Sequence, residues 1–305
     1  MSPNDTTSTT AAATTHRAGF LTLAGRTNVG KSTLLNHLVG QKVAIVTPKP
    51  QTTRRRIVGV RNDPDAQIIL LDTPGFHQSR NLLNRRMVDT ARRCLAEGEV
   101  IAAMIEAGRK LDSEDRTLLS AITALDRPTV IVINKVDKVS RGRVLPLIEE
   151  THHLMPNAEI VPLSALTGEN VDAFLRVVKP MLPAGPPRMA AEEYTDQTER
   201  MLAEEIVREK IFLAMRQEIP FSSAVVVEEF TDEAALTRIN AVIIVARESQ
   251  KGMMIGSGGR QLKAIGTAAR VELEELFDRH IFLGLVVKVE PGWTGDPRKL
   301  QELGF

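Results

Sequence analysis

The sequence predicts an α/β domain with a mostly parallel sheet and helices on both faces, followed by a smaller α+β domain. Three observations lead to this fold class. Short apolar runs alternate with amphipathic stretches from residue 18 to 182, the next segment is dense in proline ("PMLPAGPPRMA"), and strand-like runs of nine or more residues follow it. The alternation is typical of βαβ units, and a proline-dense segment is typical of a stiff linker. We therefore expect a disordered tail over 1–17, the first domain over 18–182, a linker over 183–192 and the second domain over 193–305.

Composition limits the class of protein. The 305 residues are enough for two domains, and Cys94 is the only cysteine, so no disulfide can form within the chain. No apolar run approaches the ~20 residues of a membrane-spanning helix. From Ala190 onward there are 14 Lys and Arg against 20 Asp and Glu, a net charge of −6, which is unlike a strongly basic nucleic-acid domain. We expect a cytoplasmic protein that contacts the cytoplasmic membrane at most peripherally.

A phosphate-binding loop follows the first apolar run. "GRTNVGKS", from Gly25 to Ser32, fits G-x-x-x-x-G-K-[ST] between the strand-like "FLTLA" and a helical pattern. Backbone N–H groups of such a loop wrap phosphates, while Lys31 reaches the β- and γ-phosphates and the Ser32 hydroxyl ligates Mg²⁺. We expect nucleotide contacts from Gly25, Arg26, Thr27, Asn28, Val29, Gly30, Lys31, Ser32 and Thr33.

Two further segments predict how Mg²⁺ and the γ-phosphate are held. "DTPG" (Asp72, Thr73, Pro74 and Gly75) ends the apolar run "QIILL", where a carboxylate can hold Mg²⁺ and a backbone N–H can sense the γ-phosphate. In "QTTRRR", a threonine can complete the Mg²⁺ shell and give an order–disorder switch. Thr53 is favoured over Thr52, and the arginines can equally form a solvated basic run. The predicted Mg²⁺ ligands are Ser32, Thr53 and Asp72, and the predicted catalytic residues are Lys31 and Thr53.

The last two segments predict guanine as the base. "NKVD" follows the apolar run "TVIVI", and Asp137 can accept bonds from guanine N1–H and its exocyclic amine, a pattern that adenine lacks. Asn134 and Lys135 are expected to brace this loop and pack along the base. "SAL" (Ser164, Ala165 and Leu166) follows "EIVPL" and offers a backbone N–H to guanine O6. The order of "GRTNVGKS", "DTPG", "NKVD" and "SAL" therefore predicts a GTPase of the P-loop class.

The residue after "DTPG" bears on the rate of hydrolysis. Many small GTPases carry a glutamine there, which orients the attacking water. Phe76 occupies this position and cannot hydrogen-bond water. We therefore expect slow intrinsic turnover.

A second glycine-rich loop, "IGSGGRQLK", lies in the last third of the chain. A second nucleotide site is disfavoured, because no lysine follows its last glycine and no Ser or Thr is placed to ligate Mg²⁺. A plain helix–helix turn stays open, since glycine commonly ends a helix with a positive φ. The third interpretation is the G-x-x-G loop of a KH domain, which clamps the backbone of about four single-stranded nucleotides.

The elements around the loop favour the KH interpretation. Their predicted order is helix, strand, strand, short helix, glycine loop, helix and strand, which matches the type II KH arrangement. Basic residues lie close to the loop although the domain is acidic, and they indicate a local phosphate-binding patch. The predicted RNA-binding residues are Lys251, Ile255, Gly256, Ser257, Gly258, Gly259, Arg260 and Lys263.

Together these segments resemble the Era family of bacterial GTPases, a TrmE-Era-type GTPase domain followed by a type II KH domain. The resemblance covers almost the whole chain beyond the tail. It implies GTP and GDP binding with Mg²⁺, maturation of the 30S ribosomal subunit, binding of single-stranded 16S rRNA near its 3′ end, and peripheral contact with the inner membrane; we expect a monomer. Segments that carry it are "GRTNVGKSTLLNHLVGQ", "QTTRRRIVG", "DTPG", "NKVD", "SAL", "IGSGGRQLKAIG" and "VKVEPGW".

Four positions matter within this resemblance. Thr27 stands where the family often has proline, and Ser257-Gly258 replaces a pair that often includes a lysine or arginine. Asn28 resembles the residue that helps hold K⁺ in potassium-responsive relatives, and a loop-bracing role stays open beside that one. Phe76 agrees with the family, which also lacks the glutamine.

Three functions remain as alternatives. The first is a switch in which GTP orders Thr53 and the "DTPG" loop and thereby changes the packing of the two domains. The second is a passive RNA-binding assembly factor in which GTP has mainly a structural role. The third places the protein chiefly at a membrane surface through "QTTRRR" and "NRRMVDTARR".

Overall fold

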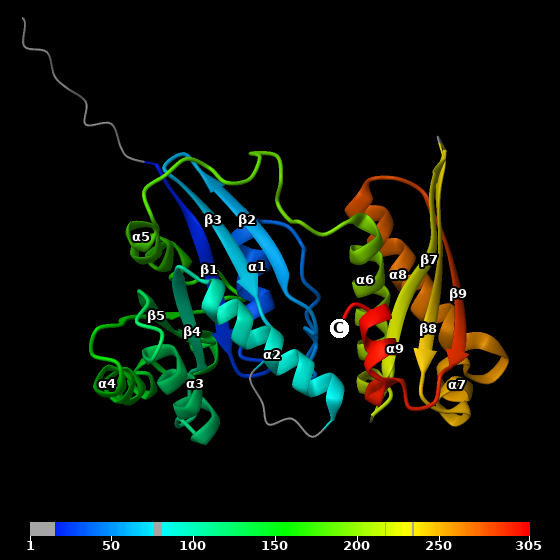
Figure 1. Cartoon of the computed structure of the whole chain (residues 1–305), viewed down its shortest axis with the longest axis horizontal. Coiled ribbons are helices and arrows are strands. Elements are labelled where there is room, and N and C mark those ends of the chain that lie inside the picture. Colours follow the sequence, from blue (N-terminus) through cyan, green and yellow to red (C-terminus); the bar gives the residue numbers. More distant parts are fainter. Residues whose placement is uncertain (1–15, 76–80, 217, 234) are drawn as a thin grey trace, which may run out of the picture.

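The chain folds into two domains that lie side by side in Figure 1. A computed structural model describes residues 16–75, 81–216, 218–233 and 235–305. The strands of the first domain are β1 (Arg17–Gly25), β2 (Ile57–Asp63), β3 (Ala66–Asp72), β4 (Val100–Glu106), β5 (Thr129–Asn134) and β6 (Glu159–Leu163). Its helices are α1 (Lys31–Val39), α2 (Leu82–Glu97), α3 (Ser113–Thr123), α4 (Leu145–Leu154) and α5 (Val171–Met181).

The first domain has the predicted mostly parallel sheet. Its strand order is β2-β3-β1-β4-β5-β6, and all neighbours are parallel except β2 and β3. We did not predict β2, which follows the arginine run and pairs antiparallel with β3, so that Ile57 lies opposite Asp72. Antiparallel neighbours need only a tight connection, and two residues separate these strands.

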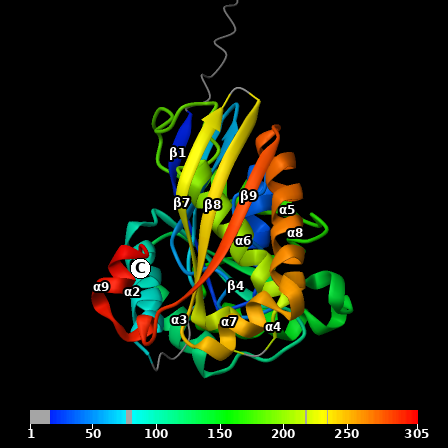
Figure 2. The ribbon, with the colours of Figure 1, turned by 90° about the vertical axis from the view of Figure 1, so that its right-hand side faces the viewer.

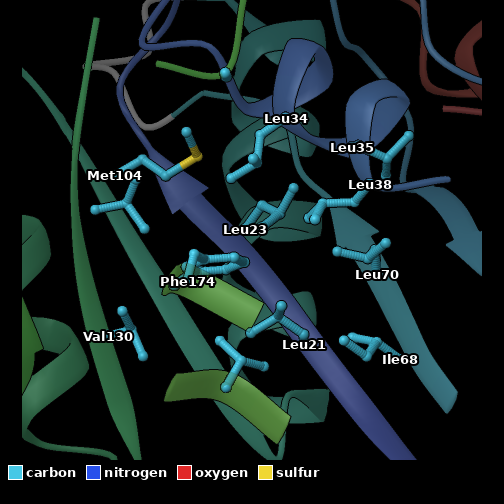
Figure 3. Packing of buried hydrophobic residues seen from close by; sticks show 14 of the residues in the cluster. Leu21, Leu23, Leu34, Leu35, Leu38, Ile68, Leu70, Met104, Val130 and Phe174 are labelled. Atoms are coloured by element: carbon cyan, nitrogen blue, oxygen red, sulfur yellow. The ribbon is translucent and has the colours of Figure 1, made fainter. Parts of the chain in front are cut away.

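Helices cover both faces of this sheet, as predicted. On one face Leu21 and Leu23 of β1 pack with Leu34 of α1 and Phe174 of α5, a cluster shown in Figure 3. On the other face Ile101 and the alternate residues of the neighbouring strands pack with α3 and α4. Parallel strands buried on both faces have apolar side chains in both directions. Their carboxyl ends meet at one edge, where the loops that carry the predicted motifs are brought together.

The domain boundaries differ from the predicted ones. β1 begins at Arg17, one residue inside the predicted tail. Beyond the predicted linker, Val60 N–H donates to Tyr194 O at 2.9 Å, and Thr195 Oγ1 donates to Val58 O at 2.7 Å. The connecting segment therefore follows the first domain as far as Thr195. The physical reason is that β2 is an edge strand, whose outer backbone groups need partners.

The second domain has the predicted order of elements. They are α6 (Glu199–Ala214), β7 (Ser223–Glu233), β8 (Leu236–Val245), α7 (Glu248–Ile255), α8 (Arg260–Phe277) and β9 (Ile281–Val289). A further helix, α9 (Pro297–Glu302), follows them and was not predicted. β7 pairs antiparallel with β8, and β9 pairs parallel with β8, an arrangement that Figure 2 shows face on. Trp293 is buried against Val242 and Ile244 of β8, and its Nε1 donates to Ser222 O at 3.1 Å. The C-terminal segment therefore packs onto the sheet through Trp293.

Candidate functional site

A cavity of about 470 Å³ opens where β1, β5 and β6 of the first sheet end. This volume lies in the usual range for small-molecule sites, about 300–1,000 Å³. The predicted residues that line it are Thr27, Asn28, Gly30, Lys31, Ser32, Thr33, Thr53, Gly75, Asn134, Lys135, Asp137, Ser164, Ala165 and Leu166. Residues that we did not predict also line it: Ile45, Val46, Thr47, Pro48, Gln51, Thr52 and Lys138. Except for Lys138, they belong to the loop between α1 and β2, from which the sequence pointed only to the threonines of "QTTRRR".

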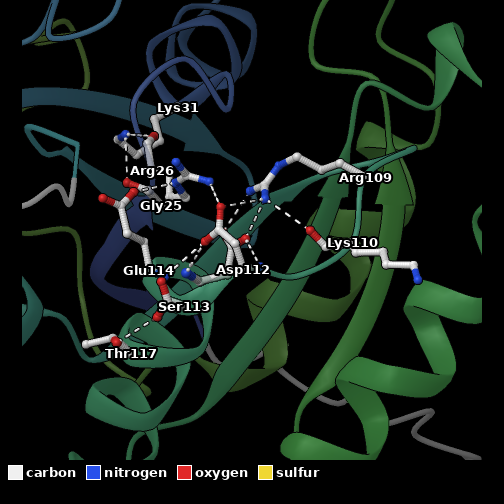
Figure 4. Close-up of polar contacts among 10 residues, drawn as sticks. Gly25, Arg26, Lys31, Arg109, Lys110, Asp112, Ser113, Glu114 and Thr117 are labelled. Carbon is white, nitrogen blue, oxygen red and sulfur yellow. Dashed lines mark hydrogen bonds and ion pairs between the residues drawn. The ribbon is translucent and has the colours of Figure 1, made fainter.

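The phosphate loop has the backbone that its glycines predict. Gly30 has φ 106° and lies at the N-terminus of α1, a conformation that favours glycine. Lys31 is buried, and its Nζ donates to Gly25 O at 3.1 Å and to Arg26 O at 2.8 Å, as Figure 4 shows. Burial lowers the pKa of Lys31 to about 8, and the charge of Asp72 opposes that shift. The Lys31 ammonium therefore lies inside the loop that would hold the phosphates.

The three predicted Mg²⁺ ligands meet in the structure. Ser32 Oγ donates to Asp72 Oδ2 at 2.5 Å, and Thr53 Oγ1 lies 3.0 Å from Ser32 Oγ and 3.3 Å from Asp72 Oδ2. Burial raises the pKa of Asp72, and Lys31 opposes this shift. Asp72 Oδ1 is buried with no hydrogen-bond partner among the described residues, which is costly for a polar atom. This set of oxygens fits Mg²⁺, a cation that prefers such ligands.

The neighbouring threonine points elsewhere. Thr52 Oγ1 lies 2.7 Å from Thr47 Oγ1 and donates to Lys49 O at 2.9 Å. Thr52 therefore forms its hydrogen bonds within its own loop, whereas the hydroxyl of Thr53 reaches Ser32 and Asp72. The geometry thus favours Thr53, in agreement with the sequence-based choice.

Asn134 connects the loops that would hold the phosphates and the base. Its Nδ2 donates to Val29 O at 2.7 Å, and its Oδ1 accepts from Ala165 N–H at 2.9 Å. Lys135 has φ 68° and pairs with Glu106 at 2.9 Å. The Ala165 N–H is therefore engaged by Asn134 in this structure. Asp137 is exposed on the cavity wall, where a carboxylate can read two guanine donors.

Some predicted contact residues support the loops without lining the cavity. The Arg26 side chain turns to α3, where it pairs with Asp112 and with Glu114 at 2.7 Å (Figure 4). Thr73 is buried and its Oγ1 donates to Leu23 O at 3.0 Å. The predicted residues that do not line the cavity are Gly25, Arg26, Val29, Asp72, Thr73 and Pro74. Phe76, from which we predicted slow turnover, lies outside the described residues.

The second glycine-rich loop connects α7 and α8. Gly256, Gly258 and Gly259 have φ of 72°, 59° and 77°, the left-handed region that favours glycine. A Cβ on Gly256 would lie 2.6 Å from Gln261 Cβ, whereas one on Gly258 would meet nothing within 4 Å. The tip of the loop is therefore open, as a loop that approaches a nucleic-acid backbone requires.

A groove of about 340 Å³ begins at this loop and runs between α8 and β9. Of the residues predicted to bind RNA, Gly259 and Lys263 line it. Residues that we did not predict complete it: Leu262, Gly266, Thr267, Arg270, Leu283 and Leu285. Those on α8 recur every three or four positions, the spacing of one helix face, so this signal was present in the sequence.

The basic residues beside the glycine loop lie apart from Glu272 of α8. Arg260 and Lys263 are exposed in its first turns, and Lys251 is half-buried on α7. Glu272 lies about 18 Å further along the helix at 1.5 Å per residue, and it pairs with Lys42 and Lys210. The loop therefore keeps the positive surroundings that we expected.

The comparisons with known proteins agree with both domains. Residues 20–135 match the family described as 50S ribosome-binding GTPase, and residues 218–294 match the KH domain. GTPase Era of Syntrophus aciditrophicus (strain SB) is 46% identical over 291 residues, which cover 95% of each chain. The chain belongs to the GTPase Era family.

Solved structures of Era have the same fold. The crystal structure of a single-residue variant of Aquifex aeolicus Era bound to GDP.AlF4⁻ is 42% identical, has a TM-score of 0.92, and covers 94% of this chain and 99% of its own. A structure of Era in complex with MgGDPNP and nucleotides 1506–1542 of 16S ribosomal RNA is also 42% identical, with a TM-score of 0.92 over 95% and 99%. The P-loop GTPase domain and the KH domain are thus confirmed, and hydrolysis of GTP is the activity of the Era family.

Proposed function

We propose that this Era-family protein is a GTP-hydrolysing switch in the cytoplasm. Its KH domain would bind single-stranded 16S rRNA near the 3′ end, and the protein would assist maturation of the 30S subunit. The observation that carries the proposal is the open glycine loop and its groove, on the same chain as a nucleotide cavity with three converging Mg²⁺ ligands. Among the relatives, the Era structure with MgGDPNP and 16S rRNA nucleotides supports this proposal.

The residues of the cavity would have separate roles in GTP hydrolysis. Lys31 would neutralise the β- and γ-phosphates, and Ser32, Thr53 and Asp72 would hold Mg²⁺. Bound Mg²⁺ supplies positive charge that stabilises the charge developing on the transferred phosphoryl group. Asn134 keeps the phosphate loop and the base loop in register, and Asp137 selects guanine. Since Thr53 belongs to the loop between α1 and β2, the presence of the γ-phosphate would be sensed there.

The RNA site is tested by Gly258→Asp. The site is open and exposed, and aspartate tolerates φ near 60°, so the fold should be retained. A carboxylate at the loop tip would repel the RNA phosphates, and we expect at least about tenfold weaker binding of a single-stranded 3′-terminal 16S rRNA fragment. Fluorescence anisotropy with the full-length protein measures this affinity.

Gly258→Asn is the matched control, because asparagine has the same shape without the charge. We expect it to bind the RNA within about threefold of the unchanged protein. GTP hydrolysis without RNA should be the same in both variants. Equal RNA affinity of the aspartate variant and the unchanged protein would remove the RNA site from this loop.

We also propose that Asn28 can hold K⁺ beside the phosphates. Asn28 Nδ2 donates to Pro48 O at 2.8 Å, which leaves the side-chain oxygen as the available ligand atom. We expect GTP hydrolysis to be at least about fivefold faster in KCl than in NaCl, because a bound cation adds charge beside the phosphates. Asn28→Gly, which tolerates φ 61°, should abolish the difference. A purely bracing role predicts that this variant is slower by the same factor in both salts.

A chiefly membrane-bound function has less support. No helix among the described residues has the length and apolarity to span a bilayer. Of the arginines in the two segments considered for membrane contact, Arg54 is buried, and Arg86 donates to the carbonyls of Pro297 and Phe305. Neither side chain is free for lipid headgroups in this structure. Arg56, Arg85, Arg92 and Arg93 of the same segments are exposed, so peripheral membrane contact stays a prediction.

A further inference from the structure

The loop between α1 and β2 contacts the KH domain through basic side chains. Lys42 pairs with Glu209 at 2.7 Å and with Glu272. Lys49 Nζ donates to the backbone carbonyls of Phe212 and Met215, at the end of α6. The loop that contains Thr53 therefore has one side on the nucleotide cavity and another on the KH domain.

Arg54 makes the most extensive of these contacts. Its side chain is buried, Nη1 donates to Ser223 O at 2.7 Å, and Nη2 donates to Pro220 O and Phe221 O, both at 2.9 Å. The guanidinium carbon also lies 5.8 Å from the ring centroid of Phe212. Burial, together with the charge of Arg208, lowers the pKa of Arg54 to about 9. The planar fork of arginine suits such simultaneous bonds in a way that lysine does not.

Arg54 directly follows the threonine of the Mg²⁺ site. Consecutive Cα atoms are about 3.8 Å apart, so a shift of one residue displaces the other. The Thr53 hydroxyl reaches Ser32 and Asp72, while the Arg54 side chain reaches the KH domain. The two neighbours therefore connect the nucleotide cavity with the KH domain over a single peptide bond.

The segment that accepts the Arg54 bonds is itself fastened to the helix before the glycine loop. Gln250 of α7 donates from Nε2 to Ser222 Oγ at 2.9 Å, and its Oε1 accepts from Ala246 N–H at 2.9 Å. α7 ends at Ile255, immediately before Gly256. A continuous set of hydrogen bonds and covalent links thus runs from the Mg²⁺ ligands to the RNA-binding loop.

We propose that Arg54 is the positioning residue through which Thr53 and the KH domain constrain each other, so that nucleotide state and RNA affinity are coupled through its bonds to residues 220, 221 and 223. The inference rests on the proposed function, because it names the route by which the switch acts. By linkage, RNA must then change the affinity for a GTP analogue by the same factor as the analogue changes the affinity for RNA.

The coupling factor is the quantity to measure. With the full-length protein, the affinity for the 3′-terminal 16S rRNA fragment is determined in the GDPNP and GDP states, and the ratio of these two affinities is the coupling factor. The affinities for GDPNP and for GDP are also determined with and without RNA. We expect a coupling factor of about five or more for the unchanged protein. Arg54→Gln should bring it to within about twofold of one, and each separate affinity in the absence of the other ligand should change by less than about threefold.

Arg56→Gln is the matched control from the same basic run. Arg56 is exposed and pairs with Glu97 of α2 at 2.8 Å and with Asp196, which precedes α6, at 3.6 Å. Its coupling factor should equal that of the unchanged protein. A structural role of Arg54 would lower the melting temperature and leave the ratio of affinities intact, so this ratio distinguishes the two roles.

The outcomes separate the inference from the proposed function. A coupling factor of one in the unchanged protein would overturn both the switch and this route. Coupling in the unchanged protein that persists at full size in Arg54→Gln would overturn the route alone. If Arg54→Gln does not fold, Arg54→Lys decides, because it keeps the charge but cannot make the three bonds together; its coupling factor must fall at least about twofold, and full coupling overturns the inference.

Discussion

Asp137→Asn is expected to lower the affinity for GTP by at least about 10²-fold and to raise the affinity for XTP. The carboxylate of Asp137 lies on the cavity wall, where it can accept from both N1–H and the exocyclic amine of guanine. Each charge-assisted bond contributes about 1.5–3 kcal/mol, so the loss of both is worth two or more powers of ten. Xanthine carries an oxygen in place of that amine, and the asparagine amide can donate to it. Isothermal titration with GTP, XTP and ATP measures the change.

Asp126→Asn is the control for this substitution. Asp126 is exposed in the same domain, has φ 50°, which asparagine tolerates, and does not line the cavity. It should leave all three affinities unchanged. If Asp137→Asn still binds GTP as tightly as the unchanged protein and discriminates against XTP, base selection does not depend on this carboxylate.

Lys31→Met is expected to weaken GTP binding by at least about 10²-fold and to remove a pH dependence that the unchanged protein should show. Methionine keeps an unbranched apolar stem in this buried position, so the fold should be retained, but it supplies no charge to the phosphates. A buried charge that meets a phosphate makes a charge-assisted bond, and its loss leaves the anion unpaired. Equilibrium binding of GTP from pH 6.5 to 9.5 measures both effects.

The sign of the pH effect follows from the pKa of Lys31, which burial lowers to about 8. Below pH 8 the free protein already carries the charged ammonium, so binding costs no protonation. Above pH 8 binding must take up a proton, and the affinity of the unchanged protein should fall by up to about tenfold per pH unit. Phosphate groups titrate near pH 6 and stay ionised throughout this window. An affinity independent of pH between 8 and 9.5 in the unchanged protein would contradict the prediction.

The nucleotide site could be predicted from the sequence because its parts are local. Gly30 with its positive φ, Lys31 and Ser32 at a helix N-terminus, and Asn134 at a strand end each follow from a short pattern and the conformation it requires. A parallel sheet then brings the strand ends to one edge without further information. The same holds for the glycine loop between α7 and α8, whose three positive φ angles explain why glycines stand there.

The groove beside that loop could be predicted from the sequence only in part. Leu262, Gly266 and Arg270 lie on one face of α8, and their helical spacing was visible. Leu283 and Leu285 complete the groove from β9, and nothing in the sequence says which helix that strand faces. Half of the groove was therefore accessible to sequence analysis, and the other half required the packing of α8 on β9.

The sequence by itself determined the two kinds of domain, the order of most of their elements, and the residues that we propose to hold phosphates, Mg²⁺ and guanine, since these depend on contacts within short segments. Only the tertiary structure decided the role of the basic run. Arg54 was as consistent with a solvated loop as with a contact, yet it is buried against carbonyls 166–169 residues further along the chain. Local patterns encode backbone conformation and burial within one element, whereas the partner of a long side chain between domains is set by how those domains pack.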